Sequence, residues 1–326
     1  MTPFASQQSQ SIGSLGESAL IEKLRAWLGD ASPAAPYGIG DDCAVLPAPT
    51  PGAQQLVTAD PVIYGKHFDD ALTPQQAAKK LLRRNLSDIA AMGGRPTHAV
   101  VSLALSPKVS ISWIKSFYQA LAEESKAYQT PIVGGDVSSA DSFLGAFLTL
   151  YGETLPHQAP LLRHRAQAGS PIFVSGALGG TRIQKHHDFE PRLPEGQWLA
   201  NSGQCLSCCD LSDGLGKDYS NLLPPSLACE IDCSKLPVSP DALTTAQSSQ
   251  QSPLYHVFND GEDFELIFAL KPDTDLAAFA SAWSQALETE VTHIGYATEL
   301  GPSPSSQLRL LNAPQDFSAT GYEHLR

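Results

Sequence analysis

The chain has 326 residues, of which 42% are hydrophobic, and its 21 Lys and Arg residues against 34 Asp and Glu residues give a formal net charge of −13. This length predicts two domains of roughly 150 residues each, and the acidic balance argues against nucleic acid or an anionic membrane as the main ligand. There is no secretory signal pattern, no apolar run long enough to span a bilayer and no disulfide framework among the six cysteines, so we expect a cytoplasmic protein.

The first half of the chain alternates predicted helices and strands. Residues 1–15 include a stretch rich in Ser and Gln and are expected to form a flexible tail. A long helix is predicted over residues 73–92, with Thr73 as its N-cap and Pro74 at the first helical position. The other predicted elements are helices over 16–27 and 111–128, a short strand directly after 38–42, and strands over 55–59, 97–105, 131–133 and 143–151. Together they define an N-terminal domain over residues 16–155.

The second half, residues 156–326, is predicted to be a separate α/β domain. We interpret residues 186–196 as irregular, with His186 and His187 in a solvated loop, and residues 239–253 as a polar loop rich in Ser and Gln. The predicted strands lie over 170–175, 205–211, 228–232 and 290–295, with a further strand after a turn within 261–270. Helices are predicted over 276–287 and after the strand within 210–223, ending at Pro224.

Five of the six cysteines lie in this second half, and two of them, Cys208 and Cys209, are adjacent. Their spacing lacks the paired C-x₂-C units of a zinc ribbon. Adjacent residues of a strand point to opposite faces of the sheet, so we interpret both as small buried apolar residues.

An aspartate recurs where a short apolar run ends. The pattern occurs at Asp41 and Asp42 in GIGDDCAVL, and again at Asp60, Asp136, Asp210 and Asp213, with a related case at Asp88 within a helical stretch. Aspartate is depleted in strands and costly to bury unpaired, so several carboxylates at strand ends would need cations. Oxygen ligands of this kind suit Mg²⁺, which usually acts together with substrate phosphates. Each aspartate alone is also typical of a turn or a helix N-cap, and that alternative stays open here.

The common phosphate-binding and hydrolytic signatures are missing: there is no P-loop, no H-E-x-x-H and no G-x-S-x-G. Seven motifs occur instead in the order seen in thiamine-monophosphate kinases, and the chain from about residue 16 onward resembles that family. They are GIGDDCAVL (38–46), TADPVIYGKHF (58–68), NLSDIAAMG (85–93), IVGGD (132–136), DLSDGL (210–215), GEDFEL (261–266) and GYEH (321–324).

The resemblance implies an α/β (α+β) subunit with the two-domain fold of aminoimidazole ribonucleotide synthetase. It further implies a homodimer whose N-terminal sheets pair into a barrel, with ATP and Mg²⁺ bound by the N-terminal domain. The implied reaction is direct in-line transfer of the γ-phosphoryl group of ATP, the co-substrate, to thiamine monophosphate with several Mg²⁺ ions. Such a reaction needs mainly positioning and charge neutralisation, which carboxylates and metal ions provide without a P-loop.

The resemblance also implies roles for individual residues, matched motif by motif. Three aspartates, Asp88, Asp136 and Asp213, are implied to be catalytic. The implied metal ligands are Asp42, Thr58, Asp60, Asp88, Asp136, Asp210 and Asp213; the implied ATP contacts are Tyr118, Gly135, Asp136, Arg163 and Ser212; and the implied residues on the thiamine side are His67, Glu262 and Tyr322. Gly135 would allow the ATP phosphates a close approach that a side chain would obstruct.

Three stretches depart from the family pattern. In one of them, Asn259 and Asp260 precede Gly261 and Glu262, where the family's approach to the glutamate is richer in glycine. Ala59 and Pro61 replace hydroxyl residues around Asp60, and residues 137–139 read Val-Ser-Ser where the family tends to have Thr-Thr. A main-chain carbonyl could replace the hydroxyl missing at Ala59. Two alternatives therefore stay open: a related ATP-dependent synthetase or kinase acting on another small phosphorylated substrate, and a nucleotide-binding relative without catalytic activity.

Overall fold

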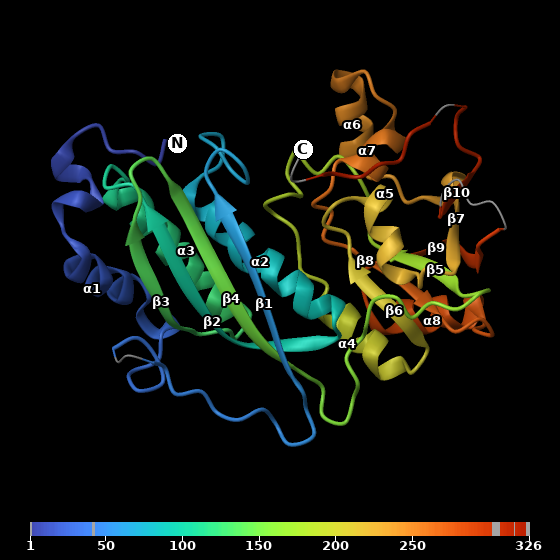
Figure 1. Cartoon of the computed structure of the whole chain (residues 1–326), viewed down its shortest axis with the longest axis horizontal. Helices are drawn as coiled ribbons and strands as arrows, with labels where there is room; N and C mark the ends of the chain where they lie inside the picture. Colours follow the sequence, from blue (N-terminus) through green and yellow to red (C-terminus); the bar gives the residue numbers. More distant parts are fainter. Residues whose placement is uncertain (1, 41–42, 302–306, 316, 324–326) are drawn as a thin grey trace. The chain divides into compact units, whose positions relative to one another are not determined.

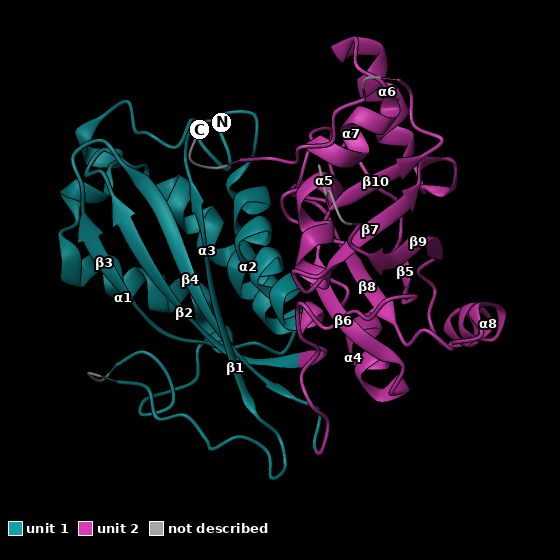
Figure 2. Cartoon of the chain, turned by 45° about the vertical axis from the view of Figure 1, so that its right-hand side comes forward, with its two compact units in different colours: residues 1–89, 95–156 teal, residues 90–94, 157–326 magenta. Residues whose placement is uncertain are grey.

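The computed structural model describes residues 2–40, 43–301, 307–315 and 317–323, which fall into two compact units (Figures 1 and 2). Unit 1 comprises residues 1–89 and 95–156, and unit 2 comprises residues 90–94 and 157–326. Each unit has its own sheet and its own core, as expected for an α/β chain of this length.

The N-terminal segment, predicted as a flexible tail, is bonded to the start of α3 (Ile111–Ala127). Phe4 forms an antiparallel bridge with Val109, and Ser11 forms another with Ser110. Ile12 is only 7% exposed. This segment is therefore part of unit 1 and contributes to its core.

Unit 1 is built on a four-stranded sheet of order β1-β4-β2-β3. β1 runs antiparallel to β4, whereas β2 and β3 are parallel, which requires the crossover that α3 provides. The predicted helices and the strands at 55–59, 97–105, 131–133 and 143–151 are confirmed, but the short strand predicted after residues 38–42 is not formed among the described residues. The elements are α1 (Glu17–Leu28), β1 (Gln55–Ile63), α2 (Pro74–Ala91), β2 (Gly94–Leu105), α3, β3 (Ile132–Ser139) and β4 (Leu144–Thr154).

The start of α2 confirms the predicted capping. The Thr73 hydroxyl oxygen accepts the Gln76 N–H at 3.2 Å, while the Gln76 side-chain oxygen accepts the Thr73 N–H at 2.9 Å, a reciprocal capping box. Leu81, Leu82 and Leu86 of this helix are fully buried. Figure 1 shows α2 and α3 behind the sheet, so their apolar sides form the core on that face.

The opposite face of the same sheet exposes apolar side chains. Val57 on β1 is 63% exposed and lies opposite Tyr151 on β4, and Phe147 is 39% exposed and lies opposite Pro61. In Figure 1 this face is turned toward the viewer, and no helix of the described chain lies in front of it. An uncovered apolar sheet face of this kind is typical of an interaction surface.

Unit 2 is built on a six-stranded sheet of order β10-β7-β9-β5-β8-β6. All its neighbouring strands are antiparallel except β10 and β7, which are parallel. The elements are β5 (Pro171–Ser175), α4 (Leu193–Ser202), β6 (Cys205–Asp210), α5 (Leu215–Asp218), β7 (Leu227–Asp232), α6 (Pro240–Ser249), α7 (Pro253–Asn259), β8 (Leu266–Leu270), α8 (Leu276–Ala286), β9 (Val291–Glu299) and β10 (Leu308–Leu311).

The central strands β5 and β8 of this second sheet are buried along their whole length, which explains why they read as apolar runs. Phe268 of β8 belongs to one core cluster, together with Trp283 of α8, whereas its neighbour Ile267 belongs to the other. Cys208 and Cys209 likewise belong to opposite clusters and are both fully buried. The interpretation of these cysteines as small apolar core residues is confirmed.

Three predictions for unit 2 are wrong. Residues 240–249 form a helix, α6, because Ser239 caps it by accepting the Ala242 N–H at 2.9 Å and Pro240 occupies its first turn. Residues 193–202 form the helix α4. The two histidines are not solvated: His187 is 7% exposed and its ring nitrogen lies 3.0 Å from that of His186.

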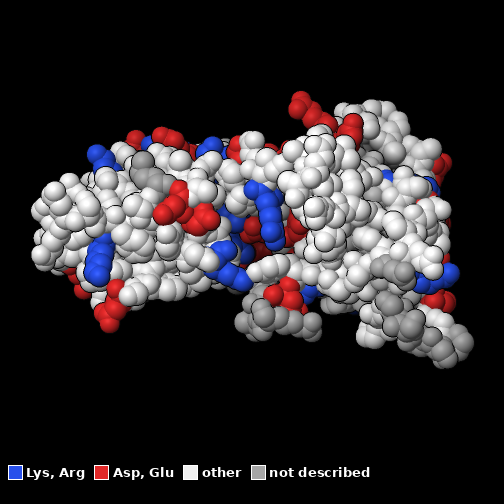
Figure 3. Space-filling view, turned by 90° about the horizontal axis from the view of Figure 1, so that it is seen from above, with Lys and Arg blue, Asp and Glu red and all other residues white. Residues whose placement is uncertain are grey.

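Charge is dispersed on the face drawn in Figure 3. Lys and Arg side chains occur there beside Asp and Glu side chains, and neither sign forms a continuous surface among the residues described. Among all the residues that the structure describes, no helix is both long enough and apolar enough to cross a membrane.

The close approach of β9 to β7 makes a prediction about stability. A Cβ atom at Gly295 would lie 1.8 Å from the Glu230 carbonyl oxygen, whereas a Cβ at Gly301 meets nothing within 4 Å. We expect Gly295→Ala to lower the free energy of unfolding by about 1–3 kcal/mol or more, because the strands must move apart. Urea unfolding measures this loss, with Gly301→Ala as the matched control. Equal stability of the two variants would contradict the strand register.

Candidate active site

The predicted site residues divide between the two units. Unit 1 holds Thr58, Asp60, His67, Asp88, Tyr118, Gly135 and Asp136, and unit 2 holds Arg163, Asp210, Ser212, Asp213, Glu262 and Tyr322. Asp42, predicted as a metal ligand, lies outside the described residues.

Two predicted metal ligands of unit 1 meet across β1 and α2. The Thr58 hydroxyl donates to a carboxylate oxygen of Asp88 at 2.5 Å. The strand places Thr58 on its inner face, and the helix brings Asp88 to the same point. This pair offers a hydroxyl and a carboxylate, which are oxygen ligands of the kind that Mg²⁺ prefers.

Asp60 is held by two neighbours on α2. Its N–H donates to the side-chain oxygen of Asn85 at 2.9 Å, and its carboxylate accepts from the Arg84 guanidinium at 3.2 Å. Arg84 also donates to the Pro61 carbonyl at 2.8 Å and is only 8% exposed. Its positive charge therefore neutralises Asp60 in the ligand-free protein and fixes the direction of that carboxylate.

The ATP residues predicted on α3 and β3 line one small pocket. This pocket has a volume of about 100 Å³, and its walls include Leu24, Val101, Tyr118, Gly135 and Asp136. Most of its lining is apolar, while the Asp136 carboxylate accepts the Ser138 hydroxyl at 2.9 Å. Burial raises the pKa of Tyr118 well above its ordinary value, so this residue is a neutral phenol at neutral pH.

The packing of β3 against β2 requires a glycine at position 135, whether or not a ligand binds there. A Cβ at this position would lie 2.0 Å from the Val101 carbonyl oxygen on the neighbouring strand β2. The two residues are register partners in the parallel pair β2 and β3. The absence of a side chain thus lets the strands approach each other.

His67 follows β1 in a turn that fixes its ring. The Ile63 N–H donates to Nδ1 at 3.1 Å, so the neutral imidazole carries its proton on Nε2. The ammonium of Lys80, which is 1% exposed, donates to the His67 carbonyl at 3.0 Å. The ring is therefore preset as a donor at Nε2.

In unit 2 the motifs DLSDGL, GEDFEL and GYEH meet through main-chain hydrogen bonds. β6 ends at Asp210, which is 3% exposed, and the chain then turns through Ser212 and Asp213. The Glu262 N–H donates to the Ser212 carbonyl at 2.8 Å, and the Tyr322 N–H donates to the Asp213 carbonyl, also at 2.8 Å. Four predicted site residues from three distant segments are thus joined directly.

The turn that carries Glu262 is conformationally demanding. Glu262 has φ 58° and Phe264 has φ 50°, values that non-glycine residues adopt rarely and that cluster at functional sites. The Phe264 N–H donates to the Leu211 carbonyl at 2.8 Å, which ties the turn to the end of β6. The turn presents a carboxylate, Glu262, that is 31% exposed.

Two ionisable residues beside Asp213 were missed by the sequence analysis. The Lys217 ammonium lies 2.7 Å from the Asp213 carboxylate, and the Asp218 carboxylate accepts the Asp213 N–H at 2.8 Å. Burial, together with the charge of Asp210, raises the pKa of Asp218 to about 8, so Asp218 is mostly protonated at neutral pH. Their spacing from Asp213, four and five residues onward, was the available signal.

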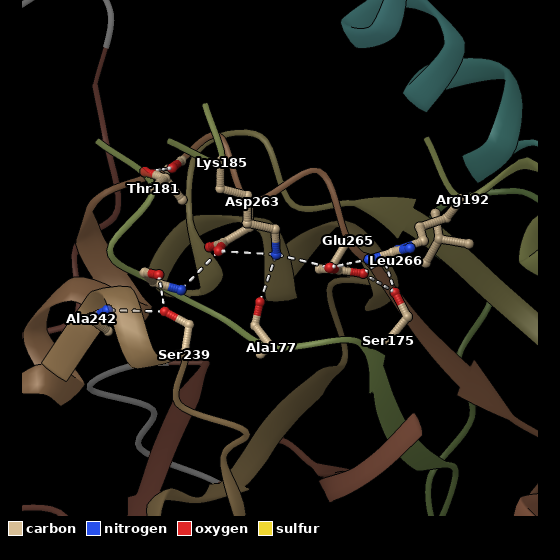
Figure 4. A network of polar contacts seen from close by, with 12 residues as sticks. Ser175, Ala177, Thr181, Lys185, Arg192, Ser239, Ala242, Asp263, Glu265 and Leu266 are labelled. Atoms are coloured by element: carbon tan, nitrogen blue, oxygen red, sulfur yellow. Dashed lines mark hydrogen bonds and ion pairs between the residues drawn. The ribbon is translucent and has the colours of Figure 1, made fainter. Parts of the chain in front are cut away.

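A buried polar network gathers around Asp263 and Glu265, which follow Glu262 in the chain (Figure 4). Arg192 binds both carboxylate oxygens of Glu265, at 2.6 and 2.7 Å, and Lys185 donates to the same carboxylate at 2.8 Å. Burial alone would raise the pKa of Glu265, but the hydrogen bonds of Arg192 and the charge of Lys185 hold it below its usual value. Ser175 donates to Glu265 at 2.7 Å and completes its coordination.

The Asp263 carboxyl accepts fewer hydrogen bonds in this network than the Glu265 carboxylate does. One of its oxygens accepts the Gly179 N–H at 2.7 Å, whereas the other is buried without a hydrogen-bond partner among the described residues. Lys185 lies 3.9 Å away. Burial raises the pKa of Asp263 to about 7, despite the opposing charge of Lys185.

Arg163 is exposed on the segment that leads into unit 2. Its neighbours fix this segment: the Cys208 N–H donates to the Leu162 carbonyl at 3.1 Å and the His164 N–H donates to the Asn221 carbonyl at 2.7 Å. The segment thus runs beside β6, the strand that ends at Asp210.

Comparisons with known proteins bear on this arrangement. Residues 40–153 match the protein family described as AIR synthase related protein, N-terminal domain. The thiamine-monophosphate kinase of Rhodopirellula baltica is 34% identical over 271 residues, which cover 81% of this chain and 84% of that protein. The chain belongs to the thiamine-monophosphate kinase family.

Solved structures of the thiamine-monophosphate kinase family agree with the fold. The enzyme of Stenotrophomonas maltophilia is 27% identical with a TM-score of 0.70, over 91% of this chain and 96% of that one. AaThiL complexed with AMPPCP and TMP is 26% identical with a TM-score of 0.71, over 95% of this chain and 97% of that one. The predicted α/β fold of the aminoimidazole ribonucleotide synthetase type is confirmed.

The buried Asp263 carboxyl makes a prediction about pH. Its folded pKa, about 7, lies above the ordinary value of 3.8, so the folded state holds this proton longer than the unfolded state. The resulting contribution to the free energy of unfolding decreases as the pH rises from about 4 to about 7, by at most about 1.4 kcal/mol per pH unit. Asp263→Asn keeps the acceptor for Gly179 and does not titrate, so its stability relative to wild type should rise across this window.

Chemical denaturation at pH 4, 5, 6, 7 and 8 measures this difference. Asp273→Asn, at an exposed carboxylate of unit 2, is the matched control and should follow wild type at each pH. A constant difference between Asp263→Asn and wild type from pH 4 to 7 would show that Asp263 titrates normally.

Proposed function

We propose that this chain is a thiamine-monophosphate kinase that transfers the γ-phosphoryl group of ATP to thiamine monophosphate and releases ADP and thiamine diphosphate. The observation that carries the proposal is the joining of Ser212, Asp213, Glu262 and Tyr322 by main-chain hydrogen bonds. Ser212 and Asp213 lie on one segment and are the proposed contacts of the nucleotide and the metal ions. Glu262 and Tyr322 lie on two other segments and are the proposed contacts of the acceptor, thiamine monophosphate. The 34% identity to the Rhodopirellula baltica enzyme supports the same reaction.

For ATP we propose the pocket of unit 1. Its apolar walls around Tyr118 suit a flat aromatic base, and Gly135 and Asp136 line the same pocket. Ser212 at the end of β6 and the exposed Arg163 are proposed contacts of the nucleotide. A guanidinium suits phosphate because its planar fork binds two oxygens at once.

For thiamine monophosphate we propose Glu262, Tyr322 and His67. The Glu262 carboxylate would face the cationic thiazolium or the aminopyrimidine, and the Tyr322 ring would stack on an aromatic ring of the substrate. His67 would donate from Nε2, the nitrogen left with its proton by the bond from Ile63. The acceptor is itself a phosphate, so this reaction needs no strong general base.

The carboxylates present fit Mg²⁺ by their chemistry, since all are oxygen ligands and Thr58 adds a hydroxyl. Among the described residues no three His, Cys, Asp or Glu side chains form a metal cluster by themselves, which suits ions that are completed by substrate phosphates and water. When bound, Mg²⁺ neutralises the charge of the transferring phosphoryl group. The residues proposed to hold the ions are Asp42, Thr58, Asp60, Asp88, Asp136, Asp210 and Asp213, with Asp88, Asp136 and Asp213 proposed as catalytic.

We further propose a homodimer in which the sheets of two N-terminal domains pair into a barrel. The uncovered face of the four-stranded sheet supports this, because Val57, Phe147 and Tyr151 present apolar surface there. A second copy of the same face is self-complementary in the way that a twofold interface requires. The domains proposed are residues 16–155 for ATP, Mg²⁺ and dimerisation and residues 156–326 for the C-terminal α/β domain.

The cytoplasm is the proposed compartment. All six cysteines are free, including the exposed Cys43, and free thiols suit a reducing environment.

The test of function is an assay of the purified chain with ATP, Mg²⁺ and thiamine monophosphate, in which thiamine diphosphate is measured by chromatography. We expect Asp88→Asn and Asp136→Asn each to lower the rate by about 100-fold or more, because metal-mediated charge stabilisation is worth several kcal/mol. The exposed Asp141→Asn is the matched control and should keep wild-type turnover.

Different failures point to different conclusions. A folded wild-type chain that binds ATP but forms no thiamine diphosphate would overturn the substrate assignment and favour another phosphorylated acceptor or a nucleotide-binding relative. Near-normal turnover of both aspartate variants at low Mg²⁺ would instead contradict the multi-metal site while leaving the substrate in place.

The dimer proposal predicts the effect of charge on the open sheet face. Val57→Glu combined with Phe147→Glu should convert a dimer into a monomer, because two carboxylates would be buried unpaired at the interface. Sedimentation velocity measures the change, and Leu243→Glu, at a 52% exposed leucine of α6, is the control. A monomeric wild-type chain, or a double variant that stays dimeric, would contradict the proposed interface.

A further inference from the structure

The C-terminal segment, residues 317–322, returns to the turn that carries Asp213. Its first residue, Phe317, packs edge-on against the buried Phe258 of α7 with ring centroids 5.4 Å apart. Its last residue, Tyr322, donates its N–H to the Asp213 carbonyl. Between these ends the segment adopts no helix or strand, so side-chain contacts must fix its path.

Asn259, the last residue of α7, supplies most of these contacts. Its side-chain oxygen accepts the Thr320 N–H at 2.9 Å, the Thr320 hydroxyl at 3.1 Å and the Gly321 N–H at 3.1 Å. Its amide nitrogen donates to the Ser318 carbonyl at 3.3 Å. Because three donors converge on one atom, that atom must be the oxygen, and the orientation of the amide is determined.

Lys217 fixes the same segment from the other side. Its ammonium donates to the Tyr322 carbonyl at 3.2 Å while it pairs with the Asp213 carboxylate. Gly321, with φ 68°, passes so close that a Cβ there would lie 2.5 Å from the Lys217 Cβ. Thr320 and Gly321 are therefore held by Asn259, and Tyr322 is held by Lys217 and Asp213.

We propose that Asn259 is a positioning residue for the acceptor side of the site, acting through the Thr320 and Gly321 main chain to set the Tyr322 ring for thiamine monophosphate. This rests on the proposed function, in which Tyr322 contacts the thiamine moiety. Asn259 also stands three residues before Glu262, so one amide connects the two segments that carry acceptor-side residues. Loosening this connection weakens acceptor binding and leaves the ATP pocket of unit 1 unchanged.

The experiment compares Asn259→Leu with Asn259→Asp. Leucine has a similar shape and no polar atom, whereas aspartate keeps an oxygen acceptor for all three donors. We expect Asn259→Leu to raise the KM for thiamine monophosphate by about fivefold to tenfold, with the KM for ATP within about twofold of wild type. Asn259→Asp should restore the KM for thiamine monophosphate to within about twofold. Asn201→Leu, on the exposed side of α4, should match wild type in both constants.

A double-mutant cycle separates positioning from general loosening of unit 2. In a Tyr322→Ala background the side chain that Asn259 positions is gone, so Asn259→Leu should add little further increase in the KM for thiamine monophosphate. Hydrogen exchange gives a second measurement that does not depend on turnover. The Thr320, Gly321 and Tyr322 amides should exchange faster in Asn259→Leu than in wild type or Asn259→Asp.

Each outcome has one meaning. An unchanged KM for thiamine monophosphate, full additivity with Tyr322→Ala, or unchanged exchange in Asn259→Leu would overturn the role of Asn259. An equal rise in the KM values for both substrates would also overturn it, since it would indicate a merely structural residue. A wild-type chain that makes no thiamine diphosphate would instead overturn the proposed function, and with it the acceptor assignment of Tyr322.

Discussion

A carboxylate cannot remain charged inside a protein without a partner, and this constraint governs the whole candidate site. The chain has 34 acidic residues and places several of them at the buried ends of strands or against helices. Removing such a group from water costs several kcal/mol unless hydrogen bonds or opposite charges compensate. The structure compensates each carboxylate in a different way, and the differences indicate which groups can be released to a ligand.

Glu265 shows full compensation. Its carboxylate accepts two hydrogen bonds from the Arg192 guanidinium, one from the Lys185 ammonium and one from the Ser175 hydroxyl. No oxygen lone pair is left for a ligand, so Glu265 is a structural anchor of the turn. Asp263 lies at the other extreme, since one oxygen lacks a partner among the described residues and its pKa is about 7.

The proposed metal ligands lie between these extremes. Asp60 pairs with Arg84, Asp88 accepts the Thr58 hydroxyl and Asp213 pairs with Lys217, so each is compensated by a polar or charged neighbour. Arg84 and Lys217 carry permanent positive charge, which stabilises these carboxylates in the ligand-free protein. The same charges compete with a metal ion for the oxygens, so binding of Mg²⁺ and phosphate requires these cations to share or to give up their contacts.

Much of the fold follows from local pattern. The helix over residues 74–91 has a capping box, proline at its first position and apolar residues at helical spacing, and the sequence alone predicted it correctly. The central strands of unit 2, β5 and β8, were predictable because burial along their whole length makes them apolar runs. The helix over residues 240–249 was missed because its polar residues resemble a loop, although Ser239 and Pro240 were sufficient start signals.

The site was predictable only as a set of motifs. The family resemblance implied roles for Asp213, Glu262 and Tyr322, but no local pattern states that the Tyr322 N–H meets the Asp213 carbonyl, since these residues are far apart in the chain. The partners Arg84 and Lys217 were missed for the same reason. The ion pairs of long side chains with carboxylates form through tertiary contacts. Sequence patterns predict helices, strands and turns, but they do not predict distances between residues across a core.

The departures from the family pattern are accommodated locally. Ser138, in the stretch where the family tends to have threonines, donates its hydroxyl to Asp136. Pro61 gives up a hydroxyl, and its carbonyl accepts from Arg84, the residue that orients Asp60.

The residues just before Glu262 also depart from the family pattern and are also accommodated by local contacts. Asp260, which makes this approach less rich in glycine than the family pattern, is paired with the buried His256 at 2.9 Å, and Asn259 binds the C-terminal segment. Ser138, Pro61 and Asn259 thus contact a proposed site residue, the residue that orients one, or the segment that carries one. The site therefore depends on which polar atoms reach the carboxylates and the acceptor-side main chain, and different side chains can supply those atoms.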